Sequence, residues 1–147
     1  MKALNTMKLQ FEGRSVNEGF SRTAVAAFLA QLDPTVEEVS DVKTAVSEAV
    51  TNCIVHAYRD SLGIVYITAG ILPDNRVVIK IRDKGCGIPD VKKAMEPLFT
   101  TAPEEERAGL GFAVMESLMD RVKVTSQEGK GTTVVLTRKI RGKEAGV

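Results

Sequence analysis

The sequence has few cysteines, no long apolar run and almost no net charge. Its two cysteines, Cys53 and Cys86, form no CxxC pair, so we expect a reduced, cytoplasmic setting. No apolar run approaches the ~20 residues of a membrane span, and Met1–Gln10 lacks the apolar core of a signal peptide. The 20 lysines and arginines nearly balance the 19 aspartates and glutamates, which leaves no general attraction to a membrane or to nucleic acid.

The usual phosphate-binding motifs are missing as well. The chain contains neither a Walker A motif nor a complete GxGxxG, so the P-loop and Rossmann routes to nucleotide binding are excluded. The single histidine, His56, falls within a long predicted helix. We expect it to pack at the helix end and not to carry a phosphate.

What the sequence does contain predicts one α+β domain. With 147 residues, of which 44% are hydrophobic, we expect a single domain over residues 1–140 and a disordered tail over 141–147. The apolar spacing predicts strands at 7–12, 64–71, 77–82, 122–126 and 132–138, and helices at 16–32, 36–57 and 111–119. Tight turns between consecutive strands imply a mixed, mainly antiparallel sheet with helices on one face, which is a two-layer sandwich.

The long helix over 36–57 carries the first candidate site. Thr35 and Glu38 match a capping box at its start. Glu48 and Asn52 are one turn apart and lie on one face, away from the apolar stripe. A solvated surface would explain both residues, but Asn is unfavourable inside a helix and its amide oxygen suits Mg²⁺. The pair predicts a metal ligand beside a carboxylate that accepts a proton or orients a hydroxyl.

The strand over 77–82 runs directly into Asp83-Lys84-Gly85-Cys86-Gly87. A glycine-rich turn with Asp as the turn former would produce this sequence. The functional alternative is that Asp83 accepts a hydrogen bond from an exocyclic amine. In that case Gly85 and Gly87 would let a flat ring or a phosphate approach the backbone.

The segment over 97–112, "PLFTTAPEEERAGLGF", is the third candidate. Two glycines stand directly before the helix predicted over 111–119, a geometry in which backbone N–H groups and the positive helix end hold phosphates. A mobile surface loop is the alternative, although a loop of this length is more often a functional lid. The residues suited to phosphate here are Thr100, Thr101, Arg107, Gly109 and Gly111.

These segments occur in a definite order: Glu-x-x-x-Asn on a helix, Asp-x-Gly-x-Gly after a strand, Gly-x-Gly before a helix, and Gly131-Thr132 near the last strand. The order resembles the Bergerat ATP-binding fold of gyrase, Hsp90, MutL and histidine kinases over nearly the whole chain. Two stretches, "SEAVTNCIVHAY" and "PLFTTAPEEERAGLGFAVMESLMD", indicate a narrower group of proteins within this fold. They resemble the anti-sigma-factor serine kinases of Gram-positive bacteria, most closely the sporulation anti-sigma F group.

The resemblance implies a role for each candidate residue. Glu48 would be the catalytic carboxylate and Asn52 the Mg²⁺ ligand. Asp83 would read adenine, with Thr132 beside it. Gly85 and Gly87 would form the walls of the adenine site. The phosphates would be held by Thr100, Thr101, Arg107, Gly109 and Gly111.

The resemblance also implies partners. The family uses ATP with Mg²⁺, forms homodimers, sequesters a sigma factor and phosphorylates a small anti-anti-sigma protein on serine. Arg22 is the predicted docking residue, and the first strand and first helix are the predicted homodimer contact. We expect no direct contact with nucleic acid or membrane.

Several alternatives stay open at this point. The chain could be a stress-response kinase of the same family, or a binding module in which ATP only sets the conformation. A detached ATPase domain of the gyrase or Hsp90 type is disfavoured, because 147 residues leave no room for a coupling domain. A histidine kinase is disfavoured by the position of His56 inside the ATP motif.

Overall fold

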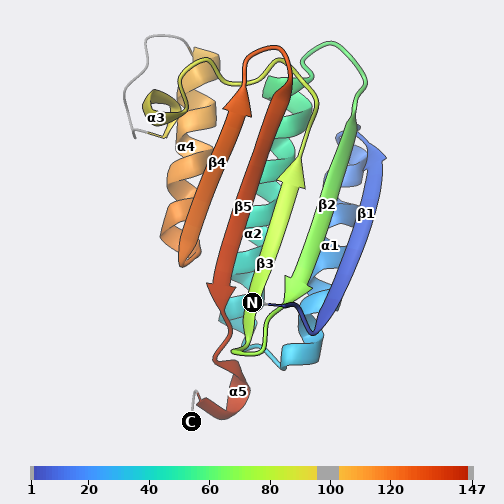
Figure 1. The fold of residues 1–147 in the computed structure, drawn as a ribbon, viewed down its shortest axis with the longest axis vertical. Coiled ribbons are helices and arrows are strands. Elements are labelled where there is room, and N and C mark those ends of the chain that lie inside the picture. The colour runs from blue at the N-terminus through green and yellow to red at the C-terminus, as the bar shows by residue number, and fades with distance from the viewer. Residues whose placement is uncertain (1, 96–102, 146–147) are drawn as a thin grey trace.

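A five-stranded antiparallel sheet forms one layer of the protein, and helices cover one of its faces (Figure 1). The computed structural model describes residues 2–95 and 103–145. The strands stand in the order β1-β2-β3-β5-β4, and their bounds are β1 Asn5–Glu12, β2 Ile64–Ile71, β3 Arg76–Arg82, β4 Arg121–Gln127 and β5 Gly131–Lys139. This architecture confirms the predicted α+β sandwich with its antiparallel sheet.

Three longer helices lie behind the sheet in Figure 1: α1 Val16–Leu29, α2 Val36–Thr51 and α4 Pro103–Leu118. Four short helical segments complete the fold: η1 Ala30–Leu32, η2 Asn52–Ala57, α3 Val91–Ala94 and α5 Gly142–Ala145. Over the described ranges, no helix is long and apolar enough to cross a membrane.

The core lies between the sheet and the helices, because most strand residues that face the helix layer are apolar. In β2 and β3 these inward residues are almost fully buried, as are the apolar residues of α1 and α2 at helical spacing. The buried set includes Val25, Leu29, Val42, Val46, Val50, Val65, Ile67, Ile79 and Ile81.

Helix α2 begins at the capping box that the sequence predicts. The backbone N–H of Glu38 donates to Thr35 Oγ1 at 3.1 Å, and the backbone N–H of Thr35 donates to Glu38 Oε1 at 2.9 Å. The helix does not keep α geometry to residue 57. At Asn52 it changes to a π-helix, η2, which closes with a hydrogen bond from Tyr58 N–H to the carbonyl of Cys53.

Two predicted boundaries are wrong. Helix α4 begins at Pro103 and not near residue 111, so Gly109 and Gly111 lie within a helix instead of directly before one. The disorder predicted from Arg141 onward also differs from the structure up to residue 145. The backbone N–H groups of Arg141 and Gly142 donate to the Glu38 carboxylate at 2.7 and 3.1 Å, which anchors α5 to the start of α2.

Candidate functional site

Glu48, Asn52 and Gly111 meet where α2 packs against α4. Glu48 and Asn52 stand one turn apart at the end of α2, as predicted, and both side chains are half-buried. A Cβ atom placed on Gly111 would lie 3.1 Å from Glu48 Oε2 and 3.4 Å from both Nδ2 and Oδ1 of Asn52. The glycine therefore leaves room for the two polar side chains of Glu48 and Asn52, which lie far earlier in the sequence.

The Asn52 amide is buried but only partly used. Among the described residues its Nδ2 has no hydrogen-bond partner, which is costly for a buried polar atom. Asn52 is also the first residue of the π-helix, and such wide turns are frequent at functional sites. The amide nitrogen of Asn52 is therefore buried without a hydrogen-bond partner among the described residues.

Asp83 is buried at the end of β3, with 5% of its surface exposed. Its Oδ1 accepts hydrogen bonds from the backbone N–H of Gly85 at 2.9 Å and of Thr132 at 3.2 Å. Burial raises the pKa of Asp83 above its ordinary value, while these two donors and the Cys53 thiol act in the opposite direction. Asp83 is thus a fixed acceptor in an apolar environment.

Cys53 joins the two parts of the site. It directly follows Asn52 in η2, it is 3% exposed, and its side chain forms a hydrogen bond with Asp83. Burial raises the pKa of the Cys53 thiol well above its ordinary value, so the group stays protonated and can donate to the carboxylate. The carboxylate at the end of β3 is therefore held beside the same helical turn that carries Asn52.

Gly85 and Gly87 allow close backbone contacts. A Cβ on Gly85 would lie 2.4 Å from the carbonyl oxygen of Ala57, so this glycine lets the loop pack on the end of η2. Gly87 has φ +76°, which L side chains rarely adopt, and it approaches the backbone of Gln127. Within the described residues, both absent side chains make room for protein backbone; their predicted role as walls of an adenine site stays a prediction.

Thr132 lies beside Asp83 and is buried. Its backbone carbonyl accepts from the N–H of Asp83 at 2.9 Å, and its hydroxyl lies 2.8 Å from Ser126 Oγ. Ser126 Oγ in turn accepts from the backbone N–H of Ile88 at 2.7 Å, so the hydroxyl pair ties β4 and β5 to the loop after Asp83. The structure thus brings Asp83 and Thr132 together, in the arrangement that the resemblance implies.

Tyr58 and Ser126 are positioning residues that the sequence reasoning missed. The Tyr58 hydroxyl accepts from the backbone N–H of Lys84 at 2.8 Å and donates to the carbonyl of Ile64, which fixes the start of the loop after Asp83. No sequence pattern marks this long-range contact. Ser126 did carry a signal, because it occupies the inward register of β4 where Val122 and Val124 are apolar.

Other predicted site residues are not tested by these contacts. Thr100 and Thr101 lie outside the described residues. Arg107 and Gly109 fall in the first half of α4, of which the structure describes the backbone alone. Arg22 lies on α1 with an exposed side chain, remote in sequence from every other candidate.

A hollow of about 590 Å³ also borders Asp83, and its lining combines inward-facing residues such as Ser126 and Thr132 with outward-facing ones. Its lining includes Arg82, Thr125 and Thr133, which alternate with inward-facing neighbours and so point away from the helices. Glu48, Asn52 and Cys53 lie on the helix side of the sheet.

Comparisons with known proteins identify the family. Residues 14–138 match the histidine kinase-like ATPase domain. An anti-sigma F factor from Caldanaerobacter subterraneus subsp. tengcongensis is 59% identical over 140 residues, which are 95% of this chain and 97% of the relative. The chain belongs to the anti-sigma F factors. The anti-sigma F factor of Geobacillus kaustophilus is 54% identical over 142 residues, covering 96% of this chain and 97% of that protein.

Solved structures share the fold of this anti-sigma F factor family member. The RsbU and RsbW domains of Rv1364c from Mycobacterium tuberculosis align with a TM-score of 0.68 at 20% identity, covering 92% of this chain and 32% of that one. The catalytic domain of the histidine kinase ThkA aligns with a TM-score of 0.58 at 14% identity, covering 91% and 96%. Membership in the ATPase family makes ATP the nucleotide and kinase-type chemistry the class of activity.

Proposed function

We propose that the protein is an ATP-dependent serine kinase that also holds a sigma factor inactive. The observation that carries the proposal is the convergence of Glu48 and Asn52 on Gly111, where α2 meets α4. Asp83 is linked to the same turn through Cys53. The relatives are named anti-sigma F factors, which supports a sigma factor as the inhibited partner.

Asp83 would recognise the adenine ring. Both backbone donors, from Gly85 and Thr132, use Oδ1, so among the described residues no backbone N–H is bonded to Oδ2. A carboxylate accepts hydrogen bonds only, and adenine presents an exocyclic amine where guanine presents a carbonyl oxygen. Asp83 would therefore favour adenine over guanine nucleotides.

Glu48 would act on the substrate hydroxyl. In the proposed step the serine oxygen attacks the γ-phosphorus, the bond from phosphorus to the leaving ADP oxygen breaks, and the serine proton passes to the Glu48 carboxylate. Gly111 would keep that carboxylate and Asn52 uncrowded.

The residues present fit a magnesium ion. Mg²⁺ takes few protein ligands together with phosphates and water, and Asn52 offers a buried side-chain amide whose nitrogen has no described partner. Because amide nitrogen and oxygen exchange by rotation, the oxygen can be the atom presented. When bound with ATP, the ion would neutralise phosphate charge.

The proposed partners are a sigma factor, a small anti-anti-sigma protein that provides the serine, and a second copy of this chain, all in the cytoplasm. Helix α1 supports a partner surface near Arg22. Val16 is 79% exposed and Phe20 is 55% exposed, although Phe20 also contacts the ring of Phe11 edge-on at 6.2 Å. Exposed large apolar side chains on the same helix as an exposed arginine suit protein contact.

Incubation with γ-labelled ATP, Mg²⁺ and the serine-containing partner tests the kinase. We expect the label on the partner's serine, and we expect Glu48→Gln to reduce transfer about 100-fold or more while ATP affinity stays within about twofold. Glu37→Gln, an exposed glutamate on the same helix, is the matched control. Transfer by Glu48→Gln at the wild-type rate would contradict the proposed role. Free phosphate without labelled partner would indicate an ATPase, and ATP binding without turnover would indicate a conformational switch.

Arg22→Glu tests the partner surface. We expect its affinity for the sigma factor or the serine substrate to fall about tenfold or more, because charge reversal replaces attraction with repulsion. ATP affinity should not change, since α1 contributes no residue to the candidate site. Surface plasmon resonance with each partner gives the measurement, with Lys92→Glu as the control. Unchanged affinity for both partners would exclude Arg22 as a docking residue.

A further inference from the structure

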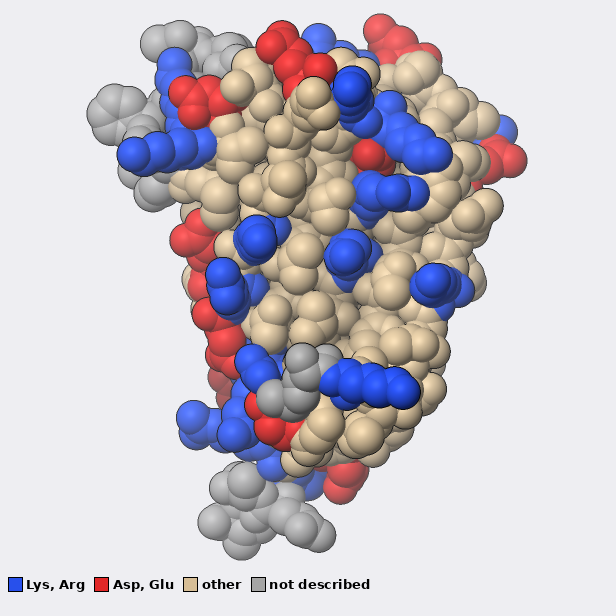
Figure 2. All heavy atoms as spheres, viewed as in Figure 1, with Lys and Arg blue, Asp and Glu red and all other residues tan. Residues whose placement is uncertain are grey.

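The face of the sheet that no helix covers carries several positive side chains, which stand out separately on a mostly uncharged surface in the middle of Figure 2. Five exposed residues, each in the outward register of its strand, define what we call the basic sheet face: Lys8, Lys80, Arg82, Arg121 and Lys123. The net charge of the whole chain is only +1, so this concentration reflects where the charges lie and not an excess of them.

The lysines of this face stand in one row across all five strands. Lys8 is opposite Thr68, and Thr68 is opposite Lys80. Lys80 is opposite Val135, and Val135 is opposite Lys123. Arg82 and Arg121 stand in the two adjacent rows, and none of the three rows contains an aspartate or glutamate.

These cations have no anionic partner in the part of the chain that the structure describes. The four ion pairs there join Arg14, Arg76, Arg138 and Lys143 to nearby carboxylates, and none includes a residue of the basic sheet face. Arg82 lies over the Tyr66 ring at 4.8 Å, a contact that leaves its charge unneutralised. Like charges on one sheet face disfavour the folded state, so a compensating anion is expected from outside.

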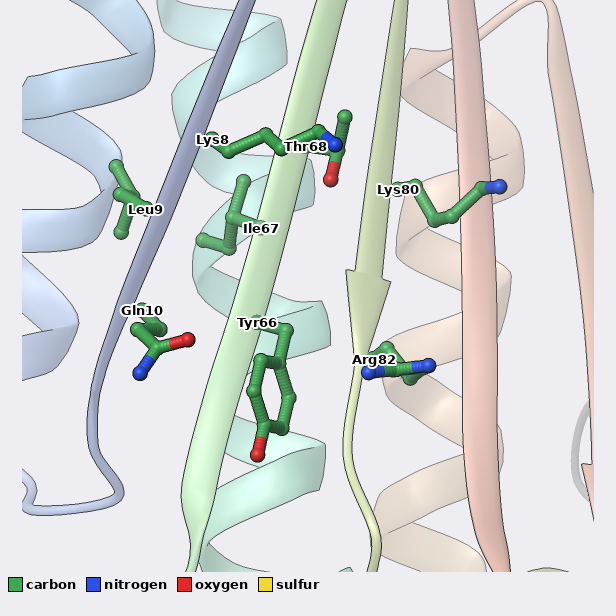
Figure 3. A pocket seen from close by; sticks show the side chains of 8 residues that line it. All are labelled: Lys8, Leu9, Gln10, Tyr66, Ile67, Thr68, Lys80 and Arg82. Atoms are coloured by element: carbon green, nitrogen blue, oxygen red, sulfur yellow. The ribbon is translucent and has the colours of Figure 1, made fainter.

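The same face is hollowed. A depression of about 420 Å³ is lined by Lys8, Tyr66, Lys80 and Arg82, whose side chains stand on three neighbouring strands (Figure 3). The second hollow, of about 590 Å³, continues from Arg82 toward β5 and β4 and adds Lys84 and Lys130. Both hollows are therefore basic, and they share Arg82.

We propose that the basic sheet face docks an acidic α-helix of a partner protein, laid across the strands. Adjacent strands are about 4.8 Å apart, so Lys8 and Lys80 are separated by about 10 Å, as are Lys80 and Lys123. Two turns of α-helix span about 10.8 Å. Carboxylates repeated every seven residues along one helix face thus match the three lysines in turn.

A protein helix fits this face better than a nucleic acid does. Binding of single strands relies on stacking of bases on several aromatic rings, whereas Tyr66 is the only aromatic residue that the five strands present here. That ring already contacts Arg82 at 4.8 Å and Lys84 at 5.0 Å. The basic sheet face lies on the side of the sheet opposite to the helix layer that carries Glu48. A partner bound there would not contact the candidate nucleotide site, so this docking function is separate from the proposed kinase activity.

Titration of the ¹⁵N-labelled full chain with a helical peptide tests the proposal. The probe is an alanine-rich peptide of about 25 residues. It carries a glutamate at every seventh position and a second glutamate one helical turn after each of these. We expect amide shifts confined to the outward face of the strands and an affinity at least about tenfold lower at 200 mM than at 20 mM salt. The triple reversal Lys8→Glu, Lys80→Glu, Lys123→Glu should weaken binding about tenfold or more, and each single reversal about two- to threefold.

The control triple is Arg59→Glu, Lys92→Glu, Lys93→Glu, which makes the same change in net charge with exposed residues outside the sheet. Equal weakening by both triples, or shifts on the helix side, would overturn the proposal. A thymidine oligonucleotide that binds the same face more tightly than the peptide would assign the face to nucleic acid and also overturn it. Serine transfer, measured in parallel, should survive the Lys8, Lys80 and Lys123 reversal, so failure here leaves the kinase proposal standing.

Discussion

At the scale of single residues, Gly111 lowers the stability of α4 but leaves room for the side chains of the candidate site. An alanine there would favour α4 by up to about 1 kcal/mol through helix propensity. Its Cβ would also lie 3.1 Å from Glu48 Oε2, closer than side chains usually approach. We expect Gly111→Ala to keep or raise the melting temperature while serine transfer falls about tenfold or more, because misplaced catalytic groups lose rate steeply.

Gly19 gives a matched control for this prediction. It is also a helical glycine, on α1, and a Cβ placed on it would meet nothing within 4 Å. Gly19→Ala should therefore stabilise the protein to a similar degree and leave transfer unchanged. Thermal denaturation and labelled transfer, run on both variants, give the comparison. Wild-type transfer by Gly111→Ala would show that the contact with Glu48 is irrelevant to catalysis.

Some site residues could be predicted from the sequence because they contradict their local setting. Asn52 opposes the propensity of its helix, and such a conflict marks functional positions. Asp83 does not, because Asp is a common turn former, and the glycines that follow it gave the signal. Gly85 was also found, but its contact with Ala57 could not be foreseen, because the two are brought together only by the fold. Tyr58 gave no signal, since its partners Lys84 and Ile64 lie on separate strand ends.

At the scale of elements, Glu38 connects the start of α2 to α5. Burial raises the pKa of Glu38, but hydrogen bonds from three backbone N–H groups and the Thr35 hydroxyl outweigh it, so the pKa lies below the ordinary value of 4.5. A lowered carboxyl pKa stabilises the fold above the unfolded value, and that contribution is lost as pH falls through the folded pKa. The junction should therefore weaken in acid.

Glu38→Gln tests this junction. The amide NH₂ of glutamine would face backbone N–H groups, and we expect the free energy of unfolding at pH 7 to fall by about 1–3 kcal/mol. The difference from wild type should begin to shrink below about pH 4.5, where the carboxylate of the unfolded chain takes up a proton, and should shrink further as pH falls through the lower folded pKa. Urea denaturation across that range gives the measurement, with the exposed neighbour Glu37→Gln as control. A constant difference at every pH would contradict the charge-based account.

The strands and the start of α2 could be read from the sequence, whereas α4 and η2 could not. Alternation gives the strands because one sheet face is buried, and the structure places β4 and β5 within a residue or two of the prediction. Glycine is unfavourable inside a helix, so Gly109 and Gly111 predicted a helix that begins near residue 111. The helix α4 begins at Pro103 instead, because its packing on α2 outweighs that local preference. The π-helix at Asn52 leaves no pattern in sequence, since it differs from α by one residue in one turn.

At the scale of the whole molecule, charge is arranged by face. Because Lys80 has Lys8 and Lys123 in its row and Arg82 two residues along its own strand, a negative charge at this position relieves repulsion. We expect Lys80→Glu to raise the free energy of unfolding by about 0.5 kcal/mol at low salt, with the gain lost at about 0.5 M salt. A natural surface whose like charges lower the free energy of unfolding usually serves to bind a partner.

Thermal denaturation at the two salt concentrations measures this effect. Lys92→Glu, on α3 and outside the sheet, makes the same charge change and should give no gain in stability at low salt. If Lys80→Glu destabilises the protein at low salt, then Lys80 already has an anionic neighbour and the basic sheet face is not a site of unrelieved repulsion.

The strand order β1-β2-β3-β5-β4 has a consequence for how the chain is made. The strand between β3 and β4 is β5, which is translated after both of its neighbours. Until residue 139 has left the ribosome, β3 keeps a bare edge and β4 has nothing to pair with, so the nascent protein carries an open template for wrong pairing. Sheet closure thus waits for the final strand, and chaperone protection during synthesis matters more here than in a meander of the same size.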